Sequence, residues 1–175
     1  MVNPFPPTIW GYNYNIKPYE YDLKKAKELL KQAGYPNGFK TTIFTTSTRN
    51  PKGAVFIQAS LAKIGIDVKI EVYEWGAYLK RTGLGEHEMA FAGWMADIAD
   101  PDNFLYTLWS KQAASAIPTQ NGSFYKSDAF SDLLVKAKRV SDQKEREALY
   151  LKAQEIIHKD VPYEIGRASC RERVS

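Results

Sequence analysis

The sequence has few residues of the kinds that build metal, disulfide and nucleophilic sites. It contains one cysteine, Cys170, and two histidines, His87 and His158, which lie far apart and lack the spacing of metal ligands. A single cysteine cannot close an internal disulfide. Neither a Gly-rich phosphate loop nor a Gly-x-Ser-x-Gly elbow occurs. We therefore expect no metal, no cofactor and no enzymatic activity.

Long apolar runs and a secretion signal are also missing. No stretch of about 18 apolar residues occurs, so we expect no membrane-spanning helix. The first residues, Met1 to Pro7, lack the basic stretch and the apolar stretch of a signal peptide. Taken alone, this absence favours a cytoplasmic protein.

The positive charge is concentrated at the carboxyl end. The formal net charge is +4, and Arg167, Arg171 and Arg173 all lie in the last nine residues. The other charges are spread evenly, and no basic stripe is interleaved with aromatic residues. We therefore expect no binding to nucleic acid.

The tail itself does not look native. From Ile165 on it has no apolar period and no turn signals, and Ile165 through Val174 match one reading frame of a widely used sequencing adapter. We therefore expect residues 165–175 to be an artefact and residues 1–164 to be the native part.

Apolar periodicity predicts an α/β fold in one domain. Helical and strand patterns alternate over the first half in the order of crossover units, and two amphipathic helices follow in the second half. The first 20 residues, rich in Pro, Tyr and Asn, are expected to be extended on the surface. Strands are predicted at 39–46, 66–73, 89–94 and, as a beginning only, 161–163; helices are predicted at 22–33, 54–64, 76–81, 101–109, 130–137 and 142–157, with a polar loop at 111–126.

An acidic segment, 97–103, is the first candidate site. An EF-hand loop is excluded, because its third and twelfth positions would be Ala99 and Leu108. Asp100 is expected to cap the next helix with Pro101 in its first turn. That leaves Asp97, which follows a predicted strand at its carboxyl end, where ligands of α/β sheets bind. A carboxylate there suits an ammonium group. A hydrolase using Asp97, Asp100 and Glu74 is an alternative that the spacing does not favour.

Two tryptophans are the second candidate. Trp75 and Trp94 follow or end predicted strands on the same side of the sheet. Core packing and a ligand pocket explain them equally well.

Several stretches together resemble the dipeptide- and oligopeptide-binding proteins of bacterial ABC importers, of the extracellular solute-binding peptide/nickel family. The resemblance covers residues 3–163. It is carried by Asn-Pro-Phe-Pro-Pro-Thr-Ile-Trp-Gly-Tyr-Asn (3–13), Tyr-Asp-Leu-Lys-Lys-Ala-Lys-Glu-Leu-Leu-Lys-Gln-Ala-Gly (21–34), Tyr-Glu-Trp-Gly-Ala-Tyr-Leu (73–79), Gly-Trp-Met-Ala-Asp (93–97) and Asp-Pro-Asp-Asn-Phe (100–104).

The resemblance implies a fold and a site. The fold would be the carboxyl-terminal lobe of a two-lobed type II periplasmic-binding-protein fold, truncated at both ends, with Met1 an internal methionine or a truncated start. Asp97 would pair with the α-ammonium of a peptide. Trp94 and Trp75 would line side-chain pockets, and Arg49 would hold the α-carboxylate.

It also implies partners and a location. The protein would be a monomeric, periplasmic or extracellular receptor that delivers short peptides to the permease subunits. It would be peripheral to the membrane through the permease or through a lipid anchor on a missing amino terminus. A related receptor for a nickel chelate, haem or an oligosaccharide is the alternative.

Overall fold

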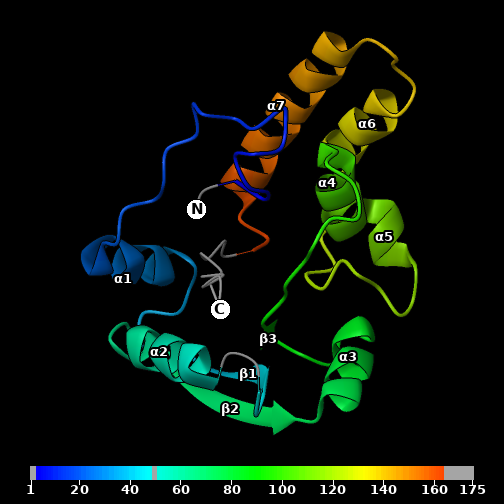
Figure 1. The fold of residues 1–175 in the computed structure, drawn as a ribbon. Coiled ribbons are helices and arrows are strands. Elements are labelled where there is room, and N and C mark those ends of the chain that lie inside the picture. Colours follow the sequence, from blue (N-terminus) through cyan, green and yellow to red (C-terminus); the bar gives the residue numbers. More distant parts are fainter. Residues whose placement is uncertain (1–2, 49–50, 164–175) are drawn as a thin grey trace, which may run out of the picture. The chain divides into compact units, whose positions relative to one another are not determined.

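The structure, a computed structural model, describes residues 3–48 and 51–163. Their contacts divide the chain into two compact units (Figure 1). Unit 1 comprises the described parts of Met1–Pro18, Met95–Ser115 and Ser123–Ser175, and unit 2 comprises those of Tyr19–Trp94 and Ala116–Gly122. The elements, in chain order, are α1 (Leu23–Gln32), β1 (Lys40–Thr46), α2 (Pro51–Ala62), β2 (Asp67–Tyr73), α3 (Trp75–Gly83), β3 (Met89–Ala90), α4 (Pro101–Trp109), α5 (Lys111–Ser115), α6 (Asp128–Ala137) and α7 (Gln143–Asp160).

Unit 2 is built on a parallel sheet with strand order β2-β1-β3. β1 pairs with β2 along its whole length, from Lys40 opposite Asp67 to Thr46 opposite Tyr73. β3 pairs with β1 at two positions only, Met89 and Ala90. Parallel strands need crossover connections, which α2 and the segment containing α3 supply here. The α/β order predicted from periodicity is therefore confirmed.

The core of unit 2 lies between the sheet and α2. Ile43 and Val68 of the sheet are 2% and 1% exposed, and Ala54 of α2 is completely buried against them. Partly buried apolar side chains extend this cluster, among them Ile57 and Leu61 of α2.

Glycines permit the two long strands to begin side by side. Gly38 and Gly65 have φ angles of +75° and +89°. A Cβ on Gly38 would lie 1.9 Å from the carbonyl oxygen of Gly65. The two turns can therefore approach only where one of them has no side chain.

Glu88 continues the β1–β3 contact before β3 begins. Its Oε2 accepts hydrogen bonds from the hydroxyls of Thr41 and Thr42, at 2.9 and 3.1 Å, and from the Thr42 N–H at 2.6 Å. These bonds, that of Thr41 first, hold the pKa of the Glu88 carboxyl below its ordinary value. The Glu88 carboxylate thus accepts the Thr42 N–H, which a carbonyl of β3 would accept if that strand began earlier.

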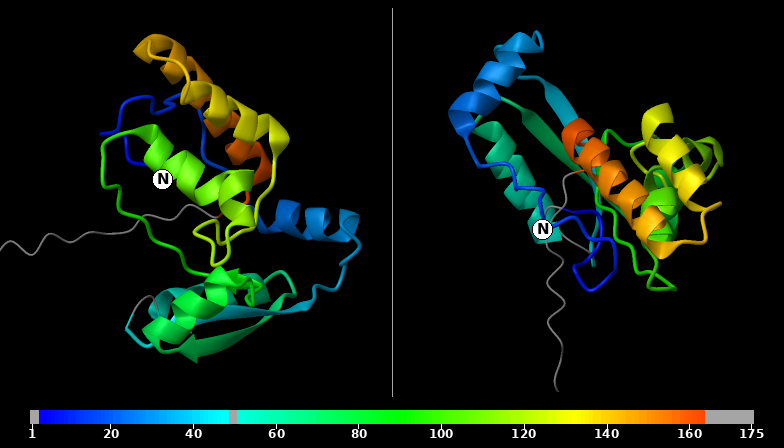
Figure 2. Two further views of the ribbon diagram at one scale, coloured as in Figure 1. Left: turned by 90° about the vertical axis from the view of Figure 1, so that its right-hand side faces the viewer. Right: turned by 90° about the horizontal axis from the view of Figure 1, so that it is seen from above.

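Unit 1 is helical, and α6 and α7 lie side by side in it (Figure 2). Each begins with a side-chain cap: Ser127 Oγ accepts from the Phe130 N–H at 3.3 Å, and Asp142 Oδ1 accepts from the Glu145 N–H at 2.8 Å. The helix predicted from residue 142 is confirmed, with Asp142 as its cap. The facing surfaces of these helices supply much of the buried core, which includes Phe130, Leu134, Ala137, Leu149, Tyr150, Ala153 and Ile157.

The amino-terminal segment is not confined to the surface, contrary to the sequence prediction. Asn3 and Phe5 are completely buried and Asn13 is 2% exposed. The carboxamide of Gln154, itself fully buried, accepts from the Asn13 N–H at 3.1 Å and donates to the Gly11 carbonyl at 2.7 Å. The segment has no regular secondary structure, so α7 satisfies its backbone groups in place of a neighbouring strand.

Three boundary predictions were wrong. The strand expected at 89–94 ends at Ala90, because pairing with β1 stops there. The loop expected at 111–126 contains the short helix α5. The strand expected at 161–163 is absent, since Val161 takes a left-handed conformation (φ 46°, ψ 51°) that ends α7.

In the part of the chain that the structure describes, no helix combines the length and the apolar character needed to cross a bilayer.

Replacing Gln154 with leucine should destabilise unit 1. The change leaves the Asn13 N–H and the Gly11 carbonyl buried without their partner, and we expect a loss of about 2–4 kcal/mol in the free energy of unfolding. Urea denaturation followed by circular dichroism measures it. Gln32→Leu, on an exposed side chain, is the matched control and should change stability by less than about 0.5 kcal/mol. Equal effects of the two variants would contradict the role given to Gln154.

Replacing Glu88 with glutamine should lower the unfolding temperature at neutral pH but not in acid. The pKa of Glu88 is lowered in the folded state, so the charged carboxylate stabilises the fold above its unfolded pKa of about 4.3, and this contribution disappears as pH falls through the folded value. Thermal unfolding of both proteins between pH 7 and 3 checks this. Glu20→Gln, at an exposed position, is the control. A difference between E88Q and wild type that persists unchanged at pH 3 would refute the account.

Candidate functional site

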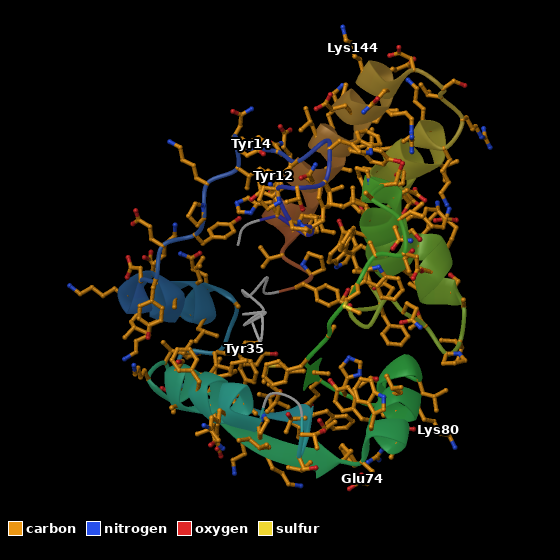
Figure 3. The ribbon with its side chains drawn as sticks, viewed as in Figure 1. Tyr12, Tyr14, Tyr35, Glu74, Lys80 and Lys144 are labelled. Atoms are coloured by element: carbon orange, nitrogen blue, oxygen red, sulfur yellow. The ribbon has the colours of Figure 1, made fainter. Side chains whose placement is uncertain are left out.

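The parallel strands in unit 2 all have their carboxyl ends on the same side of the sheet, and α/β folds bind ligands at these ends. α3 follows β2 at this end of the sheet, and residues 91–94 follow β3 (Figure 1). Glu74 and Lys80 mark the course of α3 in Figure 3. Trp75 and Trp94, two of the residues expected in a site, therefore lie on segments that follow the carboxyl ends of the strands.

Trp75 is the first residue of α3 and is 41% exposed, so core packing does not account for it. Its ring stacks on that of Tyr78, with centroids 5.8 Å apart and planes at 13°. Because Tyr78 is only 5% exposed, it is a fixed support for the tryptophan. The pair presents an aromatic surface that can cover an apolar or planar ligand group.

Trp94 lies in a stretch without regular secondary structure and is half-buried. The Tyr78 hydroxyl donates a hydrogen bond to the Phe91 carbonyl, three residues earlier. The start of this stretch is therefore attached to α3.

Charged and aromatic side chains that sequence reasoning missed lie near the end of β2. The Arg81 guanidinium lies 4.6 Å from the ring centroid of Tyr73 and 5.6 Å from that of Phe44. The Tyr73 hydroxyl donates to Glu71 at 2.6 Å, and this bond raises the pKa of Tyr73. Lys69, Glu71 and Tyr73 alternate along the strand and so share one face. The alternation of polar and apolar residues along β2 was the signal that could have shown that these three side chains lie together.

Asp97 lies in unit 1, in the bend before α4, and is exposed. It does not directly follow a buried strand, as the sequence predicted, because β3 ends seven residues earlier at Ala90. An exposed carboxylate of this kind is free to meet a cation from solvent.

The other acids of the segment 97–103 have structural roles. Asp100 caps α4, accepting from the Asp102 N–H at 2.9 Å, as predicted. Its carboxylate also accepts from Arg146 at 3.0 and 3.2 Å. Asp102 lies 3.4 Å from the Lys138 ammonium, and burial raises the pKa of its carboxyl. These engagements do not favour Asp100 as a member of a hydrolytic carboxylate pair.

Arg49 lies outside the described residues. Over residues 3–48 and 51–163, no group of three or more histidine, cysteine or acidic side chains could hold a metal ion.

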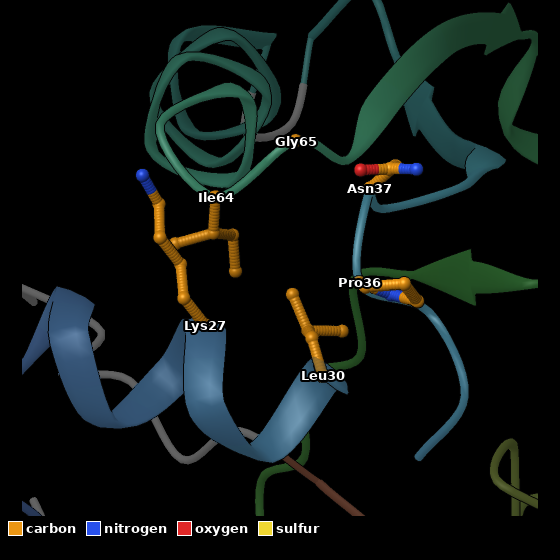
Figure 4. A pocket seen from close by; sticks show the side chains of 6 residues that line it. All are labelled: Lys27, Leu30, Pro36, Asn37, Ile64 and Gly65. Carbon is orange, nitrogen blue, oxygen red and sulfur yellow. The ribbon is translucent and has the colours of Figure 1, made fainter. Parts of the chain in front are cut away.

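A surface hollow of about 190 Å³ in unit 2 is not a peptide site. Leu30 and Lys27 of α1, Ile64 and Gly65 after α2, and the turn residues Pro36 and Asn37 line it (Figure 4). It is smaller than the roughly 300–1,000 Å³ of typical ligand pockets, and it has one charged side chain. It is a gap between packed elements.

The family model of the bacterial extracellular solute-binding proteins, family 5 (middle part), matches residues 1–116. The chain belongs to this family. Solved structures of periplasmic binding proteins share its fold, so the expected α/β lobe of that class is also confirmed.

Individual relatives agree with this assignment. The chain is similar to the dipeptide-binding protein of Escherichia coli K12, with 41% identity over 166 residues, and to heme-binding protein A of Haemophilus influenzae, with 42% over 167 residues. These matches cover 91% and 92% of the chain but only 31% and 30% of the relatives, so the chain spans just under a third of their length. Among solved structures it resembles the ABC transporter-associated periplasmic binding protein DppA from Helicobacter pylori in complex with peptide STSA, with 99% identity and a TM-score of 0.92. That match covers 93% of this chain and 32% of the other. The relatives' names describe binding proteins, not enzymes.

Proposed function

We propose that the full-length protein carrying this chain captures di- or oligopeptides outside the cytoplasmic membrane and delivers them to the permease of an ABC importer. The observation that carries this proposal is the Helicobacter pylori structure, 99% identical over the aligned part, in complex with the peptide STSA. The dipeptide-binding relative from Escherichia coli supports the same ligand class.

Asp97 is the residue that would bind the peptide's α-ammonium. Helix capping accounts for Asp100, and an ion pair with Lys138 accounts for Asp102, whereas Asp97 is exposed and neither caps a helix nor belongs to an ion pair within the described residues. A carboxylate opposite an ammonium forms a charge-assisted hydrogen bond that any peptide can satisfy, whatever its side chains.

The stretch after β3 would bind the peptide main chain. It has no regular secondary structure, and its pairing with β1 ends at Ala90. An extended peptide beside such a stretch gains main-chain hydrogen bonds that do not depend on sequence. Exposed Trp75 on its Tyr78 support, and Trp94, would then cover side chains.

Arg49 would bind the peptide's α-carboxylate through its planar guanidinium. This assignment rests on the sequence resemblance, as Arg49 lies outside the described residues. Residues 1–164 would belong to the carboxyl-terminal lobe of a two-lobed receptor, and residues 165–175 would be foreign to it.

The receptor would act in the periplasm or at the cell surface as a monomer. The family's description as extracellular supports this location. Lobe closure over the peptide would present the loaded receptor to the permease. Attachment to the membrane would run through the permease or a lipid anchor.

Haem is the second candidate ligand, because heme-binding protein A is 42% identical to the chain over 167 residues. Haem offers two carboxylates and no ammonium, so it would not need Asp97. Loss of the Asp97 carboxylate should therefore weaken the binding of peptide but not the binding of haem.

Replacing Asp97 with asparagine in the full-length protein should weaken binding of Ser-Thr-Ser-Ala by about 2–5 kcal/mol, because the ammonium would be enclosed without its counter-charge. Isothermal titration calorimetry measures this. Asp132→Asn, an exposed aspartate on α6, is the matched control and should bind the peptide as wild type does. An unchanged affinity of D97N would remove Asp97 from the site, and wild-type binding of haem but not of the peptide would replace the proposed function.

A further inference from the structure

Tyr78 contacts both segments that carry the site's tryptophans. Its ring stacks on Trp75, at 5.8 Å between centroids, and its hydroxyl donates to the Phe91 carbonyl. With 5% of its surface exposed, it has little freedom to take another position. One buried side chain therefore contacts the start of α3 and the beginning of the stretch that leads to Trp94.

Tyr78 connects segments that follow two strands which are not neighbours in the sheet. α3 follows β2, Phe91 follows β3, and β1 lies between these two strands in the sheet. α3 also packs against β1. β1 fixes the separation of β2 and β3 within the sheet, but the ladders end at Tyr73 and Ala90 and do not set the distance between the two segments that follow. Tyr78 spans this distance.

The hydrogen bond from Tyr78 to Phe91 lies directly after the last residue of β3 that pairs with β1. The β1–β3 pairing ends at Ala90, so the Phe91 carbonyl is the first beyond the ladder. The Tyr78 phenol is its partner and fixes the direction in which residues 92–94 leave the sheet. Loss of the phenol would let this stretch move while the strands stay paired.

We propose that Tyr78 is a positioning residue of the peptide site: it holds the Trp75 ring and the main chain after Phe91 at the separation that fits an extended peptide. This rests on the proposed function. Tyr78 need not touch the ligand. Its effect is to fix in advance the groups that do, so that binding loses less conformational freedom.

Tyr78→Phe in the full-length protein tests this, because it keeps the ring and removes only the hydroxyl. Calorimetry should show about three- to tenfold weaker binding of Ser-Thr-Ser-Ala, the equivalent of one lost hydrogen bond. Hydrogen exchange in the ligand-free protein should be faster at the amides of 92–94. Tyr78→Leu, which also removes the stack, should weaken binding further.

Tyr125→Phe is the matched control. It removes a phenol hydrogen bond to a carboxylate, that of Asp160, and leaves the bond from Tyr78 to Phe91 in place. It should leave peptide affinity and exchange at 92–94 unchanged. A residue that only stabilised the fold would lower the unfolding temperature without changing the affinity of the folded protein.

The outcomes separate this inference from the function on which it rests. If the wild-type protein binds the peptide and Tyr78→Phe binds it equally well, with unchanged exchange at 92–94, Tyr78 is not a positioning residue. If the wild-type protein itself does not bind Ser-Thr-Ser-Ala, the proposed function fails and this inference fails with it.

Discussion

β3 pairs with β1 through Met89 and Ala90, and the chain then leaves the sheet without regular secondary structure. A longer ladder would bury the hydrogen-bonding groups of the following residues in the sheet. Because the pairing stops early, residues 91–94 depend on other partners, of which the Tyr78 hydroxyl is one. The main chain, the tryptophan and the aspartate assigned to the site all lie in the seven residues after Ala90.

In unit 1, buried side-chain amides are the hydrogen-bond partners of a backbone that lies outside any sheet or helix. The amino-terminal segment has no secondary structure that would satisfy its own backbone, yet Asn3 and Asn13 are buried. The Asn3 side chain donates to the Asn13 carbonyl at 2.7 Å, and Gln154 binds Asn13 and Gly11 from α7. Tyr12 and Tyr14, labelled in Figure 3, lie on the same segment, with ring centroids 4.8 Å apart. The segment is thus anchored to the packed core through Asn3, Phe5 and Asn13, whereas Tyr14 is exposed.

Sequence patterns predicted the helices and the two long strands well, because these elements depend on local signals. The cap at Asp100 and the apolar periodicity of the helices are examples. The early end of β3 could not be predicted, since it depends on where pairing with β1 stops. Gln154 could not be found either, because a polar residue on a helix is usually exposed and its partners lie 141 and 143 residues away. For the candidate site, Trp75 and Trp94 were found as residues, but the Tyr78 support was not, as a tyrosine at helical spacing gives no separate signal.

The central claim is that a carboxylate of this chain recognises the free amino terminus of a peptide. The direct test is calorimetry of the full-length protein with Ser-Thr-Ser-Ala and with the same peptide acetylated at its amino terminus. Acetylation removes the positive charge and leaves the other groups in place. The account predicts that affinity falls by about 30-fold or more, as expected when one member of a buried charge pair is lost. Equal affinity for the two peptides would contradict it.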